Sequence, residues 1–208
     1  MSLKRDSTAG SVIELVVVIA AAVGIALLVQ QFLVKPYRIP SGSMEPTLAI
    51  GQRVLVDRIG ERISNPSVGD IIVFHPPTGA DTSQCGNLGQ GPFYDGPRSQ
   101  FPCGKNTGKE STQTFIKRIV AGPGDTLAVH GGYAVVNGKL QTAPYIRACG
   151  GGPECELKAI RIPAGSYFMM GDNRGQSDDS RFWGPVPQAW LIGTAFATYW
   201  PPNRVGLF

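Results

Sequence analysis

The feature that most constrains the fold is a long apolar run near the N-terminus, from Ser11 to Val34. As a helix, residues 12–34 would span about 35 Å, which is enough to cross a hydrocarbon core of about 30 Å. Its one charged residue, Glu14, falls in the first turn, where the carboxylate can reach the headgroup region. The run is apolar on all sides rather than amphipathic, which favours a membrane helix over a buried helix of a globular domain.

A cleaved secretory signal is the competing interpretation of this run. Its apolar region would be only about 7–15 residues long, and the Ala20-Ala21-Ala22 sequence that resembles a cleavage site falls in the middle of the run. We therefore expect an uncleaved, single-pass anchor over 12–34, after a tail over 1–11. Basic residues stand on both sides of the anchor and do not orient it: Lys4, Arg5, Lys35 and Arg38.

The chain after the anchor, residues 35–208, predicts a mainly β fold. Short runs rich in β-branched and aromatic residues alternate with turns, in a chain with 27 glycines and 17 prolines. Asn137-Gly138 between two such runs is typical of a β-hairpin. Residues 76–113 are poor in aliphatic side chains, and we expect them to form a surface insertion. The expected strands lie at 52–59, 70–75, 114–121, 126–130, 133–136, 139–141, 158–170 and 191–200.

The charge distribution argues against one class of function. The formal net charge is only +4, and no basic run of five or more residues occurs. Proteins that bind nucleic acid usually gather lysine and arginine on one face or in one segment. The sequence therefore does not indicate nucleic-acid binding.

Four cysteines indicate the compartment. Cys149 and Cys155 flank a glycine-rich segment that can bend back to close a disulfide, and Cys85 with Cys103 would then pin the insertion. A zinc site is the alternative, but no C-x₂-C pair occurs and the chain has only two histidines; buried free thiols are a further alternative. An even number of cysteines in loop-like segments favours disulfides, and so an oxidising compartment. On this basis we expect residues 35–208 outside the cytoplasm and the tail inside.

A candidate nucleophile follows the anchor closely. In Pro40-Ser41-Gly42-Ser43 a glycine between two serines allows a tight turn, and a serine held there can attack a substrate if a base removes its proton. A plain surface turn has the same composition. The candidate base must come from elsewhere in the chain.

Lys117 is the strongest candidate for that base. It lies within an apolar strand, where alternation places it on one face with Phe115 and Ile119. Burial of a lysine disfavours its charged form and lowers its pKa, although an edge lysine that reaches solvent would fit the same spacing. His75 and His130 have no carboxylate partner in a known triad order, and we interpret them as surface histidines.

A polar loop from Gly171 to Arg181 supplies groups that could hold a lysine in position. It contains paired charges and hydroxyl groups directly after an apolar strand. A calcium-binding loop is the alternative, but the glycine and glutamate positions of an EF-hand are absent.

Three blocks together resemble the bacterial type I signal peptidases. They cover 41–48, 116–125 and 171–184, in that family's order, with the anchor before them. The resemblance implies a membrane-bound serine endopeptidase that uses a Ser/Lys dyad to cleave signal peptides from secretory preproteins. It also implies a mainly β, signal-peptidase-like fold with a small cap, here about 126–162, and no metal or cofactor.

The same resemblance assigns roles to individual residues. Ser43 is the nucleophile, Lys117 the general base, and Ser177 the residue that hydrogen-bonds and orients Lys117. The oxyanion hole is the Ser41 hydroxyl with the Ser43 backbone N–H. Supporting residues are Asp179, Arg181, Asp172 and Arg174. Residues expected to line the substrate pockets are Ile39, Pro40, Met44, Leu48, Phe115 and Ile116. Candidates for an apolar surface that touches membrane lipid are Tyr37, Trp183, Trp190 and Trp200.

The chain departs from that family at three places, and other interpretations stay open. Gly175-Gln176 stands where the family often has Asp-Asn, the segment between Asp125 and Pro163 is short, so the cap must be small, and 76–113 matches nothing we can assign. A soluble relative such as the self-cleaving SOS repressors shares the dyad but lacks the anchor. A specialised processing peptidase would carry the same motifs. A non-enzymatic, membrane-tethered β module predicts that a penem would not acylate Ser43.

Overall fold

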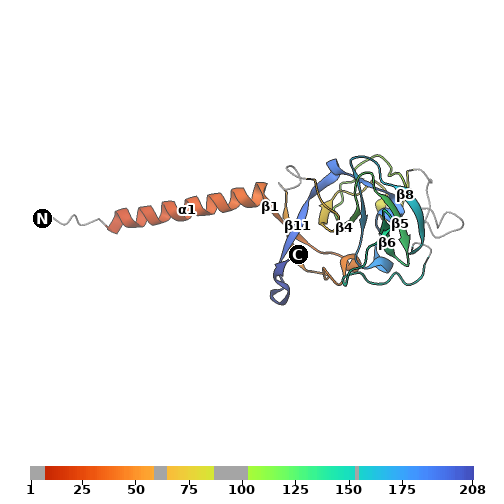
Figure 1. Cartoon of the computed structure of the whole chain (residues 1–208). Coiled ribbons are helices and arrows are strands. Elements are labelled where there is room, and N and C mark those ends of the chain that lie inside the picture. The colour runs from red at the N-terminus through yellow and green to blue at the C-terminus, as the bar shows by residue number, and fades with distance from the viewer. Residues whose placement is uncertain (1–7, 59–64, 87–102, 153–154) are drawn as a thin grey trace.

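The computed structural model describes residues 8–58, 65–86, 103–152 and 155–208 and consists of one long helix followed by a β body (Figure 1). Helix α1 spans Thr8–Phe32 and projects away from the body. Its window Gly10–Leu27 has a mean hydropathy of 2.5 and is not buried inside the protein. The single N-terminal apolar helix is thus confirmed, and the first seven residues of the expected tail lie outside the described residues.

Helix α1 ends at Phe32, two residues before Val34, the expected end of the anchor. Val34 instead begins strand β1, Val34–Arg38. Pro36 lacks a backbone N–H, and its ring disfavours a helical conformation of the preceding residue, so the chain becomes extended as it approaches the proline. β1 forms the edge of a sheet, the position in which a sheet tolerates proline.

The larger sheet is antiparallel and has the order β1-β2-β11-β3-β4-β9-β10, with β12 paired to β11. Strands β3 and β4 lie near its centre, and the four side chains of β3 are all buried. The strands that join β1 in this sheet are β2 Arg53–Asp57, β3 Ile71–Phe74, β4 Phe115–Ala121, β9 Ser166–Met170, β10 Val186–Pro187, β11 Leu191–Trp200 and β12 Gly206–Leu207.

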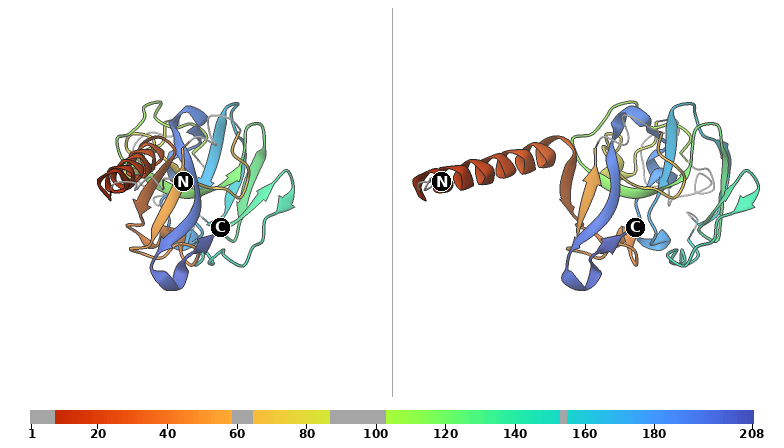
Figure 2. Two further views of the ribbon diagram at one scale, coloured as in Figure 1. Left: turned by 90° about the vertical axis from the view of Figure 1, so that its left-hand side faces the viewer. Right: turned by 60° about the vertical axis from the view of Figure 1, so that its left-hand side comes forward.

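A smaller sheet of order β7-β6-β5-β8 falls in the region expected to be a cap. It lies on the side of the body away from α1 (Figures 1 and 2). Asn137 and Gly138 both have positive φ in the turn from β6 to β7, as a two-residue hairpin requires. The strands are β5 Thr126–His130, β6 Tyr133–Val136, β7 Lys139–Leu140 and β8 Leu157–Arg161.

The mainly β fold is therefore confirmed, and each of the expected runs contains a strand. The run 158–170 divides into β8 and β9, because a turn at residues 163–165 includes Gly165 with positive φ. Strands β1, β10 and β12 were not predicted. Short helical segments complete the fold: η1 Gly42–Met44, η2 Ala80–Thr82, η5 Arg174–Gln176, α3 Ser180–Trp183, η6 Gln188–Trp190 and η7 Pro202–Arg204.

Both predicted disulfides are present, Cys85–Cys103 and Cys149–Cys155. Part of the expected surface insertion, 76–113, is not on the surface. Cys85 and Cys103 are buried and pack in one apolar cluster with Phe74 and Trp183. The insertion thus contributes this disulfide to the core, whereas its residues 87–102 lie outside the described part.

Because the Cys85–Cys103 disulfide closes a loop of 18 residues inside a core cluster, removing it should lower stability. We predict that the double variant Cys85→Ala/Cys103→Ala loses about 3 kcal/mol of unfolding free energy. Urea unfolding of the full chain in detergent measures the loss. The matched pair Cys149→Ala/Cys155→Ala opens a shorter loop, with a separation of 6, and should lose less. A wild-type midpoint for the Cys85/Cys103 variant would contradict the prediction.

Candidate active site

Ser43 lies on the short helix η1, and its side chain is buried. Met44 and Leu48 anchor this turn, because both side chains are completely buried in a cluster that also contains Ile39. Two backbone hydrogen bonds close the turn, from Glu45 N–H to the Gly42 carbonyl and from the Leu48 N–H to the Met44 carbonyl. The apolar side chains thus fix the place of the hydroxyl.

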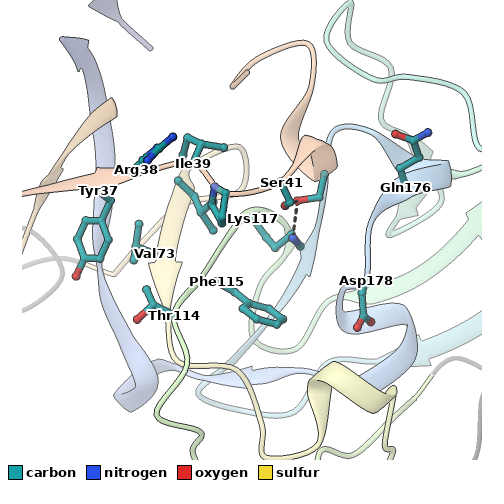
Figure 3. A pocket seen from close by; sticks show the side chains of 13 residues that line it. Tyr37, Arg38, Ile39, Ser41, Val73, Thr114, Phe115, Lys117, Gln176 and Asp178 are labelled. Atoms are coloured by element: carbon teal, nitrogen blue, oxygen red, sulfur yellow. Dashed lines mark hydrogen bonds between the residues drawn. The ribbon is translucent and has the colours of Figure 1, made fainter. Parts of the chain in front are cut away.

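Lys117 extends from the middle of β4 to Ser43. Its Nζ lies 2.8 Å from Ser43 Oγ and donates a hydrogen bond to it (Figure 3, dashed line). Lys117 is 5% exposed and Ser43 6% exposed, so little water reaches the pair. Burial lowers the pKa of Lys117 to about 8, and the negative charges of Asp179 and Asp178 oppose this shift without reversing it. A substantial fraction of the amine is therefore neutral near pH 8 and able to accept a proton.

Two hydrogen-bond donors lie on the same turn as the Ser43 hydroxyl. The Ser41 hydroxyl is 3.3 Å from Ser43 Oγ and partly accessible from the groove. The backbone N–H of Ser43 lies in the first turn of η1, where N–H groups have no acceptor within the helix. Both groups are available to an oxygen that develops negative charge next to Ser43.

Asp179 and Arg181 of the polar loop form a fully buried ion pair. Arg181 Nε and Nη2 lie 2.8 and 2.9 Å from the two carboxylate oxygens. Burial opposes ionisation of Asp179, but the Arg181 charge, the Arg181 hydrogen bond, the Gly171 N–H and the Ser177 hydroxyl hold its pKa below the ordinary value. Arg181 also donates to the Arg174 and Ser177 carbonyl groups, so the pair fixes the backbone of the polar loop.

Asp172 makes a second buried pair with a residue that the sequence analysis did not single out. Arg118 Nε and Nη2 lie 2.8 and 2.7 Å from its carboxylate oxygens. Arg118 follows Lys117 in β4, and Asp172 begins the polar loop after β9. The pair therefore ties the loop to the strand that carries Lys117. The sequence did offer a sign of this pair, because Arg118 is a second charged side chain, next to Lys117, in an otherwise apolar strand.

Ser177 does not make the expected hydrogen bond to Lys117. Its side chain is buried, and the described residues contain no hydrogen bond between the two groups. Its hydroxyl instead lies beside the Asp179 carboxylate, whose pKa it helps to lower. The predicted supporting residues Asp172, Arg174, Asp179 and Arg181 do gather around this loop, and all four are buried.

Gly171 is the point where the polar loop meets the serine turn. Its N–H donates to Asp179 at 3.1 Å, and its carbonyl accepts from Arg174 Nε at 3.0 Å. A Cβ at this position would overlap both the Ser43 carbonyl oxygen and Ser177 Oγ. Because that space is filled by backbone, only glycine fits between the turn and the loop.

A groove of about 510 Å³ is lined by Ser43 and Lys117 among other residues. Of the predicted pocket residues, Ile39, Pro40, Phe115 and Ile116 line it. Met44 and Leu48 do not, because their side chains are directed into the core cluster beneath the turn. Lining residues that the sequence analysis did not assign to the pocket are Tyr37, Arg38, Val73, Thr114, Gln176 and Asp178.

Comparisons with a family sequence pattern and with individual proteins point to the same family. The sequence pattern of the family described as signal peptidase, peptidase S26, matches residues 12–200. A probable signal peptidase I-2 from Synechocystis is 36% identical over 195 residues, which cover 94% of this chain and 76% of that protein. A probable signal peptidase I-1 of the same organism is 37% identical over 193 residues, covering 93% and 85%. Signal peptidase I of Leptolyngbya laminosa is 35% identical over 188 residues, covering 90% and 79%.

We predict that Gly171→Ala damages the site, because the added methyl group must displace the Ser43 carbonyl. The expected cost is about 1–3 kcal/mol of unfolding free energy, with slower acylation of Ser43 by a penem. The matched control is Gly206→Ala, where a Cβ meets no atom within 4 Å. Equal acylation rates in the two variants would contradict this account of the contact.

Proposed function

Because the chain belongs to the signal peptidase family, peptidase S26, and acts as a signal-peptide-cleaving serine endopeptidase, we propose that Ser43 and Lys117 form its catalytic dyad. The observation that carries this proposal is the 2.8 Å hydrogen bond between a buried amine of lowered pKa and a buried hydroxyl. A serine nucleophile needs such an adjacent base.

In the acylation step, neutral Lys117 takes the proton of Ser43 as its oxygen attacks the scissile carbonyl carbon. The carbonyl oxygen becomes an oxyanion, which the Ser43 N–H and the Ser41 hydroxyl stabilise. By analogy with other oxyanion holes, each donor contributes about 3 kcal/mol to the transition state. The protonated Lys117 then donates its proton to the leaving amine of the mature protein, and the signal peptide remains as an ester of Ser43.

In the deacylation step, Lys117 is neutral again and deprotonates a water molecule that attacks the ester carbonyl. Collapse of the second tetrahedral intermediate returns the proton to Ser43 and frees the signal peptide. Side chains and water account for each proton and bond in this sequence, so the scheme uses no cofactor. Asp179, Arg181 and Gly171 act by holding the polar loop, and through it the Ser43 turn, in place.

Preproteins with signal peptides are the substrates, and they reach the groove from the membrane. We propose that α1 crosses the bilayer, with the tail in the cytoplasm and the β body outside. Two disulfides support an oxidising location for the body. The mild net charge and lack of basic clusters support a protein that does not bind nucleic acid.

Lipid contact close to α1 is part of the same proposal, with a correction to its expected residues. Trp183 is completely buried and cannot touch lipid, and Trp190 packs against the same core cluster. Trp200 is 51% exposed at the end of β11, and the adjacent C-terminal segment exposes Leu207 and Phe208. Trp200 with this segment therefore fits lipid contact better than Trp183 does.

We predict that Lys117→Arg is as inactive as Lys117→Met. Arginine keeps the charge and the approximate length, but its guanidinium does not give up a proton in proteins. Cleavage of a preprotein in detergent measures the effect, with Ser43→Ala as the inactive reference. Near-wild-type cleavage by Lys117→Arg would show that a cation, not a base, is needed at this position.

The pH dependence gives an independent prediction. The base works only when it is deprotonated, so kcat/KM should be low below the Lys117 pKa and rise as the pH increases through it. Burial places this rise at about pH 8 rather than near the ordinary value of 10.5. If kcat/KM rose only near pH 10.5, Lys117 would not be desolvated in the free enzyme.

The topology proposal predicts that a protease added to intact, wall-stripped cells digests the β body. A tag on the N-terminal tail should survive, because the membrane separates it from the protease. Detergent lysis provides the control in which both parts are digested. Protection of the β body in intact cells would contradict the proposed orientation.

A further inference from the structure

Asp178 is a carboxyl group in the groove with no role in the scheme above. It lines the groove together with Lys117, Phe115 and Gln176. Its Oδ1 is shielded from solvent and has no hydrogen-bond partner within the described residues. Asp178 as a whole is half-buried and lines the groove, so its charge acts on a chain bound there although Oδ1 itself is out of reach.

The neighbouring cations are engaged elsewhere. Lys117 Nζ donates to Ser43, and Arg181 is paired with Asp179 and bonded to two backbone carbonyl groups. Asp81 of η2 adds a further negative charge near Asp178. Asp178 is therefore a carboxyl group to which the protein side of the groove supplies no direct partner among the residues described.

The two ends of the groove face different parts of a substrate. Tyr37 and Arg38 form one end and belong to β1, which follows α1 directly. Gln176 and Asp178 lie on the other side of Lys117 (Figure 3). A signal peptide held in the membrane enters from the β1 end, so the residues after the scissile bond leave past Gln176 and Asp178.

We propose that Asp178 is a specificity-determining residue whose charge favours a basic side chain at one of the first two residues of the mature protein. This inference rests on the proposed function. The apolar walls near Ile39 and Ile116 suit the signal-peptide side, whereas Asp178 gives the other end a charge. A lysine or arginine there would be attracted to the Asp178 carboxylate, and a glutamate would be repelled by it.

The preference for a basic residue should depend on the protonation state of Asp178. Burial first, and then the charge of Asp179, raises the pKa of Asp178 to about 7, with Asp81 acting in the same direction and Lys117 and Arg181 opposing. Above this pH the side chain is mainly a carboxylate and attracts a cation. Below it the side chain is mainly neutral, so the preference for a basic residue should weaken.

The test uses matched peptides that differ only in having lysine, alanine or glutamate at the first or the second mature position. At about pH 8.5, full-length wild-type protein in detergent should cleave the lysine peptide at least about tenfold better than the glutamate peptide at one of these positions. Asp178→Asn should bring the lysine-to-glutamate ratio of kcat/KM close to one. Lowering the pH to about 6 should reduce the ratio in the wild type but not in Asp178→Asn.

Two further variants keep the test decisive. Glu110→Gln removes an exposed carboxylate outside this groove and should leave the ratio at its wild-type value. Gln176→Lys places a cation at the same end of the groove and should move the preference toward glutamate, whether or not Asp178→Asn folds. A ratio near one in the wild type, or a ratio unchanged by Asp178→Asn and Gln176→Lys, would overturn the inference. Because the alanine peptides report cleavage itself, either result leaves the proposed function standing, whereas no cleavage of any peptide would count against that function.

Discussion

The hydrogen bond from Lys117 to Ser43 depends on keeping a buried amine uncharged. A protonated lysine without water is costly, and that cost is what lowers its pKa. The same burial makes Lys117 useful as a base near neutral pH. The surrounding structure keeps water from this amine: β3 and β9 flank β4, and the Phe115 ring centroid lies 5.6 Å from Lys117 Nζ.

Carboxylates near such an amine would restore its charge unless their own charge were balanced. Asp172 and Asp179 each meet an arginine through two hydrogen bonds, and the four side chains are buried in these pairs. Asp179 still raises the pKa of Lys117 somewhat, while Arg181 lowers it. The ion pairs therefore have two effects, since they order the polar loop and also limit the negative field at Lys117. Replacing one member of a pair would change both the position and the pKa of the Lys117 amine.

Much of this arrangement could be predicted from the sequence, because local patterns encode it. Alternation and turn residues predicted the main strands. Local patterns made Ser43 and Lys117 candidates, and the resemblance to the signal peptidases implied that they form a dyad. What could not be predicted depends on contacts between segments distant in the chain. The role of Arg118 follows only from its pairing with Asp172, and the need for glycine at 171 follows only from its contact with the Ser43 carbonyl. Met44 and Leu48 support the turn from below rather than line the groove, a distinction that sequence spacing does not make.

The central claim is that the resting amine of Lys117 loses its proton far more readily than an ordinary lysine. The direct measurement is an NMR titration of full-length protein labelled with ¹⁵N-lysine, followed from about pH 6 to about pH 12, with the Lys117→Arg spectrum to assign the signal. We predict that Lys117 Nζ titrates at about pH 8. A midpoint near 10.5, the ordinary lysine value, would mean that the amine is solvated and would contradict the account.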